Sequence, residues 1–126
     1  TWDQWPEFDQ KVREATQAAL DDVCGGGTVN CRFTHVYPDG PAPYYTYVGN
    51  YKKDGYFEQQ DAIKIAASDA IISAGGTITH HHAVGRLHKP WYDVERPELF
   101  AESLKAMKKV CDPSGILNPG VLIDPA

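Results

Sequence analysis

Long apolar runs are absent from this sequence. No stretch approaches the about 20 apolar residues that a membrane-spanning helix requires. An excess of positive charge is also absent, because 17 acidic and 12 basic residues give a net charge of −5. That balance gives no support for a nucleic-acid partner. With 42% hydrophobic and 23% charged residues, the 126-residue chain fits one globular domain.

Cysteine is scarce. The three cysteines, Cys24, Cys31 and Cys111, show no spacing typical of a metal site, and their odd number argues against a disulfide framework. We therefore expect a reducing, intracellular setting. An initiating methionine and a signal-peptide pattern are also missing, so we expect a piece of a longer protein.

The first half of the chain predicts a helix followed by a hairpin. Apolar residues recur every three or four positions from Asp3 to Val23, which indicates a helix with one apolar face, and three glycines end it. β-branched and aromatic residues predict antiparallel strands at 28–37 and 44–51. Pro38, Asp39, Gly40 and Pro41 supply the turn between them.

The second half predicts two more helices and a short strand. A long helix is expected after the turn at 52–55 and reaches about Ala74, followed by a strand at 76–79. Residues 86–96 are polar and are predicted to be irregular. Pro97 opens the last helix, whose inward-facing residues are expected to be Phe100, Leu104, Met107 and Val110.

The predicted order is therefore α-β-β-α-β-α, and the predicted fold class is α+β. One strand in front would complete the split βαβ unit of ferredoxin-like folds. We expect an incomplete ferredoxin-like cap domain with an antiparallel sheet, followed by a C-terminal helix and tail. The missing strand would be central, beside the last one. Its absence would leave open backbone edges, which predicts either a truncated parent protein or strand exchange in a homodimer.

Three adjacent histidines, His80, His81 and His82, are the clearest candidate site. An imidazole changes charge near neutral pH, so it can move protons, bind metal or stabilise an anion. In an extended backbone the first and third would share one face and the second would lie on the other. That alternation favours two different roles over one metal cage, and no spaced ligand pattern supplies further metal donors. We therefore assign no metal ligands, although a metal site and solvated polar side chains remain alternatives.

The segment 75–91 carries a family resemblance. It reads Gly-Gly-Thr-Ile-Thr, three histidines, Ala-Val-Gly-Arg and a tryptophan five residues later. This resembles the active-site segment of the alkyldihydroxyacetonephosphate synthases, flavoenzymes of the vanillyl-alcohol-oxidase superfamily, in which the pattern is Gly-Gly-Ser-Leu-Ser, three histidines and Gly-Val-Gly-Lys. The strands at 31–35 and 44–51 also resemble that family. The closing segment 112–120 resembles FAD-linked oxidases more widely.

The resemblance implies that residues 1–126 are the C-terminal part of a larger FAD-dependent enzyme, with the FAD-binding domain upstream as its partner. The reaction would exchange the acyl group of acyl-dihydroxyacetone phosphate for a long-chain alcohol in ether-lipid synthesis. The substrates would be a lipid-like phosphate ester and a fatty alcohol, which allows peripheral membrane contact. A cytoplasmic or membrane-peripheral location would follow in a bacterium, and a peroxisomal one in a eukaryote. The isolated chain is expected neither to bind FAD tightly nor to turn over.

The resemblance also implies residue roles. Tyr44 matches the tyrosine that transfers a proton, and His80, His81 and His82 match the essential histidines. His81 and His82 are expected beside the flavin, with Asn118 as a further cofactor contact, and Arg86 and His88 are expected to bind substrate. A histidinium about 4 Å from a developing charge contributes roughly 4 kcal/mol at an effective dielectric near 20, against about 1 kcal/mol for a neutral hydrogen bond. A charged imidazole would therefore stabilise the developing charge more than neutral hydrogen bonds do.

Several positions depart from the family pattern, among them Ala83, which replaces glycine, Arg86, which replaces lysine, His88, which replaces arginine, and Pro90, which replaces glutamine. Two other functions stay open. One is an FAD-linked 2-hydroxyacid oxidoreductase of the lactate or glycolate type, although His81 stands where those enzymes have a metal-binding glutamate. The other is a stand-alone ferredoxin-like binding or metal module.

Overall fold

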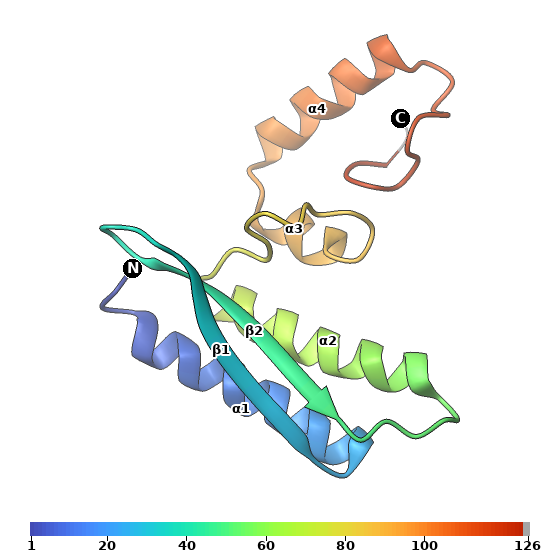
Figure 1. Cartoon of the computed structure of the whole chain (residues 1–126). Coiled ribbons are helices and arrows are strands. Elements are labelled where there is room, and N and C mark those ends of the chain that lie inside the picture. The colour runs from blue at the N-terminus through green and yellow to red at the C-terminus, as the bar shows by residue number, and fades with distance from the viewer. Residues whose placement is uncertain (125–126) are drawn as a thin grey trace. The chain divides into compact units, whose positions relative to one another are not determined.

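The computed structural model describes residues 1–124 and has the predicted α+β class. Its elements are α1 (Trp5–Cys24), β1 (Gly27–Val36), β2 (Pro41–Gly49), α2 (Tyr56–Ser73), α3 (Lys89–Glu95) and α4 (Glu98–Cys111) (Figure 1). The chain forms two compact units, one comprising Thr1–Gly76 and the other starting at Thr77. The first unit holds α1, the hairpin and α2, and the second holds α3 and α4.

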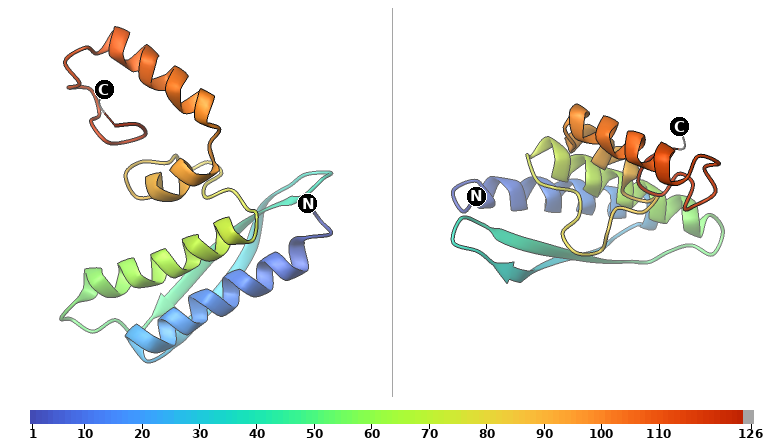
Figure 2. Two further views of the ribbon diagram at one scale, coloured as in Figure 1. Left: turned by 180° about the vertical axis from the view of Figure 1, so that it is seen from behind. Right: turned by 90° about the horizontal axis from the view of Figure 1, so that it is seen from above.

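In the first unit, α1 and α2 lie side by side on one face of the hairpin (Figure 2). Four residues of α1 at intervals of four, Val12, Thr16, Leu20 and Cys24, are buried and form one stripe. The stripe meets Ile63 of α2, and Val29, Tyr47 and Tyr51 pack around the same core. Gly25 ends α1 in the left-handed conformation (φ 70°), which glycine adopts without a steric penalty.

The hairpin is antiparallel and runs in register from Gly27 opposite Gly49 to Val36 opposite Pro41, with one irregularity between Phe33 and His35. The second strand begins three residues earlier than predicted. Pro41 was assigned to the turn, but in a two-stranded sheet both Pro41 and Pro43 lie on an edge strand, where a missing N–H is tolerated. The hairpin also lies very close to α1, because a Cβ at Gly49 would be 2.8 Å from Leu20 Cδ2.

Two predictions of secondary structure are wrong. Residues 76–79 do not form a strand, and β1 and β2 are the two strands among residues 1–124. A strand needs a neighbouring strand for its backbone bonds, and here the Ile78 amide bonds to the Glu95 carboxylate instead. The described order is consistent with an incomplete split βαβ unit. The stretch 86–96, predicted to be irregular, contains α3, with Pro90 in its first turn.

The second unit leaves the apolar side of α4 uncovered. Phe100, Met107 and Val110 were predicted to face inward, but they are 48%, 56% and 83% exposed, while Ala101 is buried and Leu104 half-buried. The apolar spacing specified the helix correctly but could not specify what covers it. Within the described chain, every helix is too short or too polar to cross a membrane.

Candidate functional site

The three candidate histidines lie in a bent loop of the second unit, which we call the histidine loop (residues 77–85). All three are exposed, and their rings meet edge to face. The ring centroids of His80 and His81 are 5.5 Å apart, and those of His81 and His82 are 4.4 Å apart. Because the backbone bends at each histidine, the strand-like alternation of their side chains does not occur. The loop instead presents the imidazoles as one contiguous cluster.

The start of the histidine loop is held by α3. Thr77 Oγ1 and the Ile78 amide both donate to the Glu95 carboxylate, each at 3.0 Å. A carboxylate that accepts two bonds is a strong acceptor, because charge-assisted hydrogen bonds are stronger than neutral ones. The segment that precedes the histidines is therefore fixed although it has no strand partner.

The end of the loop is held by His88. Its backbone amide donates to the Val84 carbonyl at 3.1 Å, and its ring Nδ1 lies 3.3 Å from the Ala83 carbonyl, to which the Nδ1–H tautomer donates. Ala83 itself has φ 61°, in the left-handed region that non-glycine residues rarely adopt. This conformation accounts for the glycine that the family pattern has at the position of Ala83.

Arg86 lies against the turn that contains Asn118. Its Nη2 donates to the Pro119 carbonyl at 2.8 Å, and a Cβ at Gly120 would lie 4.0 Å from its Nε. Asn118 has φ 45°, and its carbonyl accepts from the Val121 amide. The structure thus brings together a residue predicted to bind substrate and one predicted to contact the cofactor, although they are far apart in the sequence.

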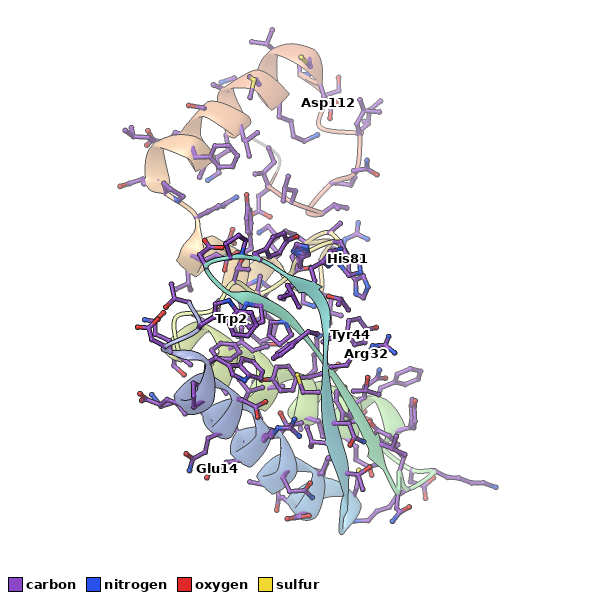
Figure 3. All side chains as sticks on the ribbon, turned by 60° about the vertical axis from the view of Figure 1, so that its left-hand side comes forward. Trp2, Glu14, Arg32, Tyr44, His81 and Asp112 are labelled. Carbon is purple, nitrogen blue, oxygen red and sulfur yellow. The ribbon has the colours of Figure 1, made fainter. Side chains whose placement is uncertain are left out.

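Tyr44 lies in the first unit, on the face of the hairpin away from the helices. Arg32 is directly opposite it in the register, and the guanidinium carbon is 4.8 Å from the centre of the tyrosine ring (Figure 3). Such a contact between a cation and an aromatic face orients both groups. Sequence reasoning missed Arg32, and the signal that could have found it is the hairpin register, which depends on the position of the turn.

The neighbouring tyrosines point the other way and pack. The Tyr45 hydroxyl donates to Asp9 Oδ1 at 2.9 Å, and Tyr47 and Tyr51 contact the core. Burial, followed by the bond to Asp9, raises the pKa of Tyr45 far above its usual range, so this phenol stays protonated. The sequence could not separate these tyrosines from Tyr44 by composition, but strand alternation does so once the register is known.

The candidate residues therefore fall into two groups. His80, His81, His82, Arg86, His88 and Asn118 belong to the second unit, and Tyr44 belongs to the first. The donor set of the second unit fits the redox-active ring of a flavin, since imidazoles and an amide can bond to the nitrogen and oxygen atoms at its edge and one imidazolium can stabilise negative charge there. His80, His81, His82 and Asn118 are exposed, as contacts to a separate group require, whereas His88 is half-buried.

Comparison with a protein-family description and with characterised proteins places these residues in context. The description "FAD linked oxidases, C-terminal domain" matches residues 1–122. The chain is 35% identical to an alkyldihydroxyacetonephosphate synthase of Caenorhabditis elegans, over 98% of this chain and 21% of that protein. It is 30% identical to the Trypanosoma brucei brucei protein of the same name, over 75% of this chain and 16% of that protein.

A relative with a different name is less similar. The glycolate oxidase subunit GlcD of Bacillus subtilis is 27% identical over 81% of this chain and 22% of its own length. The chain thus spans about a fifth of the length of the curated relatives it matches. The match over residues 1–122, together with the histidine loop and the Asn118 turn, shows that the chain belongs to the FAD-linked oxidases, as their C-terminal domain.

Proposed function

We propose that this chain is the C-terminal part of an FAD-dependent enzyme of the alkyldihydroxyacetonephosphate synthase type, which exchanges the acyl group of acyl-dihydroxyacetone phosphate for a long-chain alcohol. The main support is the cluster of three exposed imidazoles in a loop held at both ends. The likeness to the two synthases of that name supports the same reaction. The FAD-binding part of the site would be supplied by polypeptide outside these 126 residues.

The three imidazoles would carry out the proton and charge chemistry. When bound, FAD supplies an electron-accepting ring next to the carbon that reacts. His80, His81 and His82 provide a base for a proton beside the substrate carbonyl, and a cation that stabilises the charge that develops. We assign the charged role to His81 or His82. Their ring centroids are 4.4 Å apart, so a cation on either ring would lie directly beside the other ring.

Tyr44 would transfer a proton from the first unit. Its position on the helix-free face leaves the hydroxyl outside the apolar core, in contrast to Tyr45. Arg32 holds the ring from the opposite strand and brings a positive charge to the same face. That charge would favour an anionic group, such as the substrate phosphate, near Tyr44.

The proposed substrates also suggest where the enzyme acts. A lipid-like phosphate ester and a fatty alcohol partition into membranes, so we propose an intracellular enzyme with peripheral membrane contact. It would be cytoplasmic in a bacterium and peroxisomal in a eukaryote.

A second candidate function has its own support. The likeness to a glycolate oxidase subunit, and to a D-2-hydroxyglutarate dehydrogenase that is 31% identical over 54% of this chain, allows oxidation of a 2-hydroxyacid with the histidines as bases. His81 at the position of a glutamate in that class favours the transferase.

One assay separates these functions. The complete gene product is incubated with acyl-dihydroxyacetone phosphate and a fatty alcohol, and the ether product and released acid are measured. We expect ether formation that His81→Ala lowers by at least about a hundredfold, the scale of losing a general base. The matched control is Lys53→Ala, an exposed loop residue of the first unit. Flavin reduction by a 2-hydroxyacid without ether formation would support the oxidoreductase, and a flavin-free protein loaded with metal would support the binding module.

A further inference from the structure

The C-terminal tail of the second unit (residues 118–124) is held at three points by cations of the segment 86–96. Arg86 binds the Pro119 carbonyl, Arg96 Nη1 donates to the Leu122 carbonyl at 3.3 Å, and Lys89 Nζ binds the Asp124 carboxylate at 2.9 Å. The first of these contacts along the tail, at Pro119, is made by Arg86, the residue that directly follows the histidine loop. The tail is therefore attached throughout its length to the segment that follows the histidines.

The three contacts differ in burial. The side chains of Lys89 and Arg96 are 15% and 9% exposed, and both also pair with Asp93 of α3. Their charges are held in a fixed network, and the bond to Asp124 raises the pKa of Lys89. Arg86 is exposed and donates to the Pro119 carbonyl. Lys89 and Arg96 thus hold the body of the tail, and Arg86 holds only the turn at its start.

That turn contains Asn118, and Arg86 follows the histidine loop directly. The guanidinium lies against the Pro119–Gly120 peptide, as both its bond to Pro119 and its distance to a Cβ at Gly120 show. Asn118 and Gly120 have positive φ values of 45° and 70°, which makes the turn conformationally specific. A bond at this point fixes where the Asn118 side chain lies relative to the loop.

We propose that Arg86 is a positioning residue, which joins the Asn118 turn to the histidine loop so that the amide and the imidazoles keep one fixed arrangement toward the flavin. This inference rests on the proposed function for the identity of the flavin. This role differs from direct binding of the substrate phosphate by Arg86. A guanidinium that donates to the Pro119 carbonyl affects the site by fixing the position of the Asn118 turn.

The first test measures the turn itself and needs no activity. Hydrogen exchange of residues 118–124 is followed in the complete protein and in the Arg86→Met and Arg86→Lys variants. We expect exchange about tenfold faster in Arg86→Met, the effect of losing one charge-assisted bond, and partial recovery in Arg86→Lys, which keeps one donor. Arg96→Met is the structural comparison, because it should lower the melting temperature whereas Arg86→Met should leave it nearly unchanged. Unchanged exchange in Arg86→Met would overturn the proposal.

The second test measures the site. In the flavin-loaded enzyme, Arg86→Met should shift the visible flavin absorption and lower kcat, with the KM for the phosphorylated substrate within about twofold of the wild-type value. Lys53→Met serves as the control for loss of an exposed cation. A KM raised tenfold or more with an unchanged spectrum and unchanged exchange would instead assign Arg86 to the phosphate. A protein without flavin would overturn the proposed function, and the exchange measurement would still decide whether Arg86 holds the turn.

Discussion

Arg32 and Tyr44 face each other across the hairpin, with the guanidinium carbon 4.8 Å from the ring centre, while Tyr45 turns to the opposite face and bonds to Asp9. Two adjacent tyrosines therefore have different roles. The one beside Arg32 lies on the face of the hairpin away from the helices and is the one we propose for proton transfer, whereas the other joins β2 to α1. This difference gives a direct test.

Tyr44→Phe should lower the activity of the complete enzyme by at least about a hundredfold, because it removes the hydroxyl that we propose transfers a proton. The melting temperature should stay unchanged. Tyr45→Phe should do the reverse. It should lower the free energy of unfolding by about 1–3 kcal/mol, since the half-buried Asp9 carboxylate loses a hydrogen-bond donor. Steady-state kinetics and urea unfolding of both variants check this. A Tyr45→Phe enzyme with full stability and no activity would reverse the assignment.

The raised pKa of Tyr45 predicts a dependence of stability on pH. The folded state holds the Tyr45 phenol protonated. The contribution of this phenol to the free energy of unfolding is therefore fully present below the ordinary pKa of tyrosine, about 10, and is lost as the pH rises above it. Unfolding measured between pH 8 and about 11 should show a loss of stability at the alkaline end that is smaller in Tyr45→Phe. An equal loss in both proteins would contradict the prediction.

Ala83→Gly should stabilise the second unit. Ala83 has φ 61°, a conformation that costs an L-residue about 1 kcal/mol and glycine almost nothing. Part of this gain is offset because glycine makes the unfolded chain more flexible. The melting temperature should rise slightly in Ala83→Gly and fall in Ala83→Val, whose branched side chain is worse in this region. A lower melting temperature for Ala83→Gly would show that the left-handed conformation is not strained.

Gly49→Ala should destabilise the first unit by about 1–3 kcal/mol, the usual cost of overpacking. The new Cβ would lie 2.8 Å from Leu20 Cδ2 and 3.1 Å from Cys24 Sγ, and so would push the hairpin away from α1. Thr46→Ala, at an exposed position of the same strand, should change stability by less than about 0.5 kcal/mol. Denaturant unfolding of the two variants makes the comparison, and equal midpoints would contradict close packing at Gly49.

Asp112 should control the turn after α4. Its carboxylate accepts from the Ile116 and Leu117 amides and from Lys108 Nζ, and the bond to Lys108 lowers its pKa. The contribution of the Asp112 carboxylate to the free energy of unfolding is therefore present at pH values above the ordinary pKa of aspartate and is lost as the pH falls below it. Exchange of the Ile116 and Leu117 amides should be about tenfold faster in Asp112→Ala at neutral pH. Equal exchange in the two proteins would contradict the role of Asp112.

The sequence by itself determined α1, α2, α4, the hairpin and the histidine cluster, because apolar spacing, glycine stops and a triple histidine are local features. Its likeness to one flavoenzyme family was also readable, since the motif from Gly75 to Trp91 is contiguous. The early start of β2 and the helix at Lys89–Glu95 were missed because a proline has a different meaning at a turn, on an edge strand and in a first helical turn.

Only the tertiary structure decided which tyrosine faces outward, that Ile78 bonds to Glu95 rather than to a strand, and that Arg86 holds the Asn118 turn. Each of these contacts joins residues distant in the sequence, so each depends on how elements pack rather than on local preference. The exposed apolar side of α4 illustrates the same limit. Spacing specifies an amphipathic face, but a covering surface is a property of the packed protein.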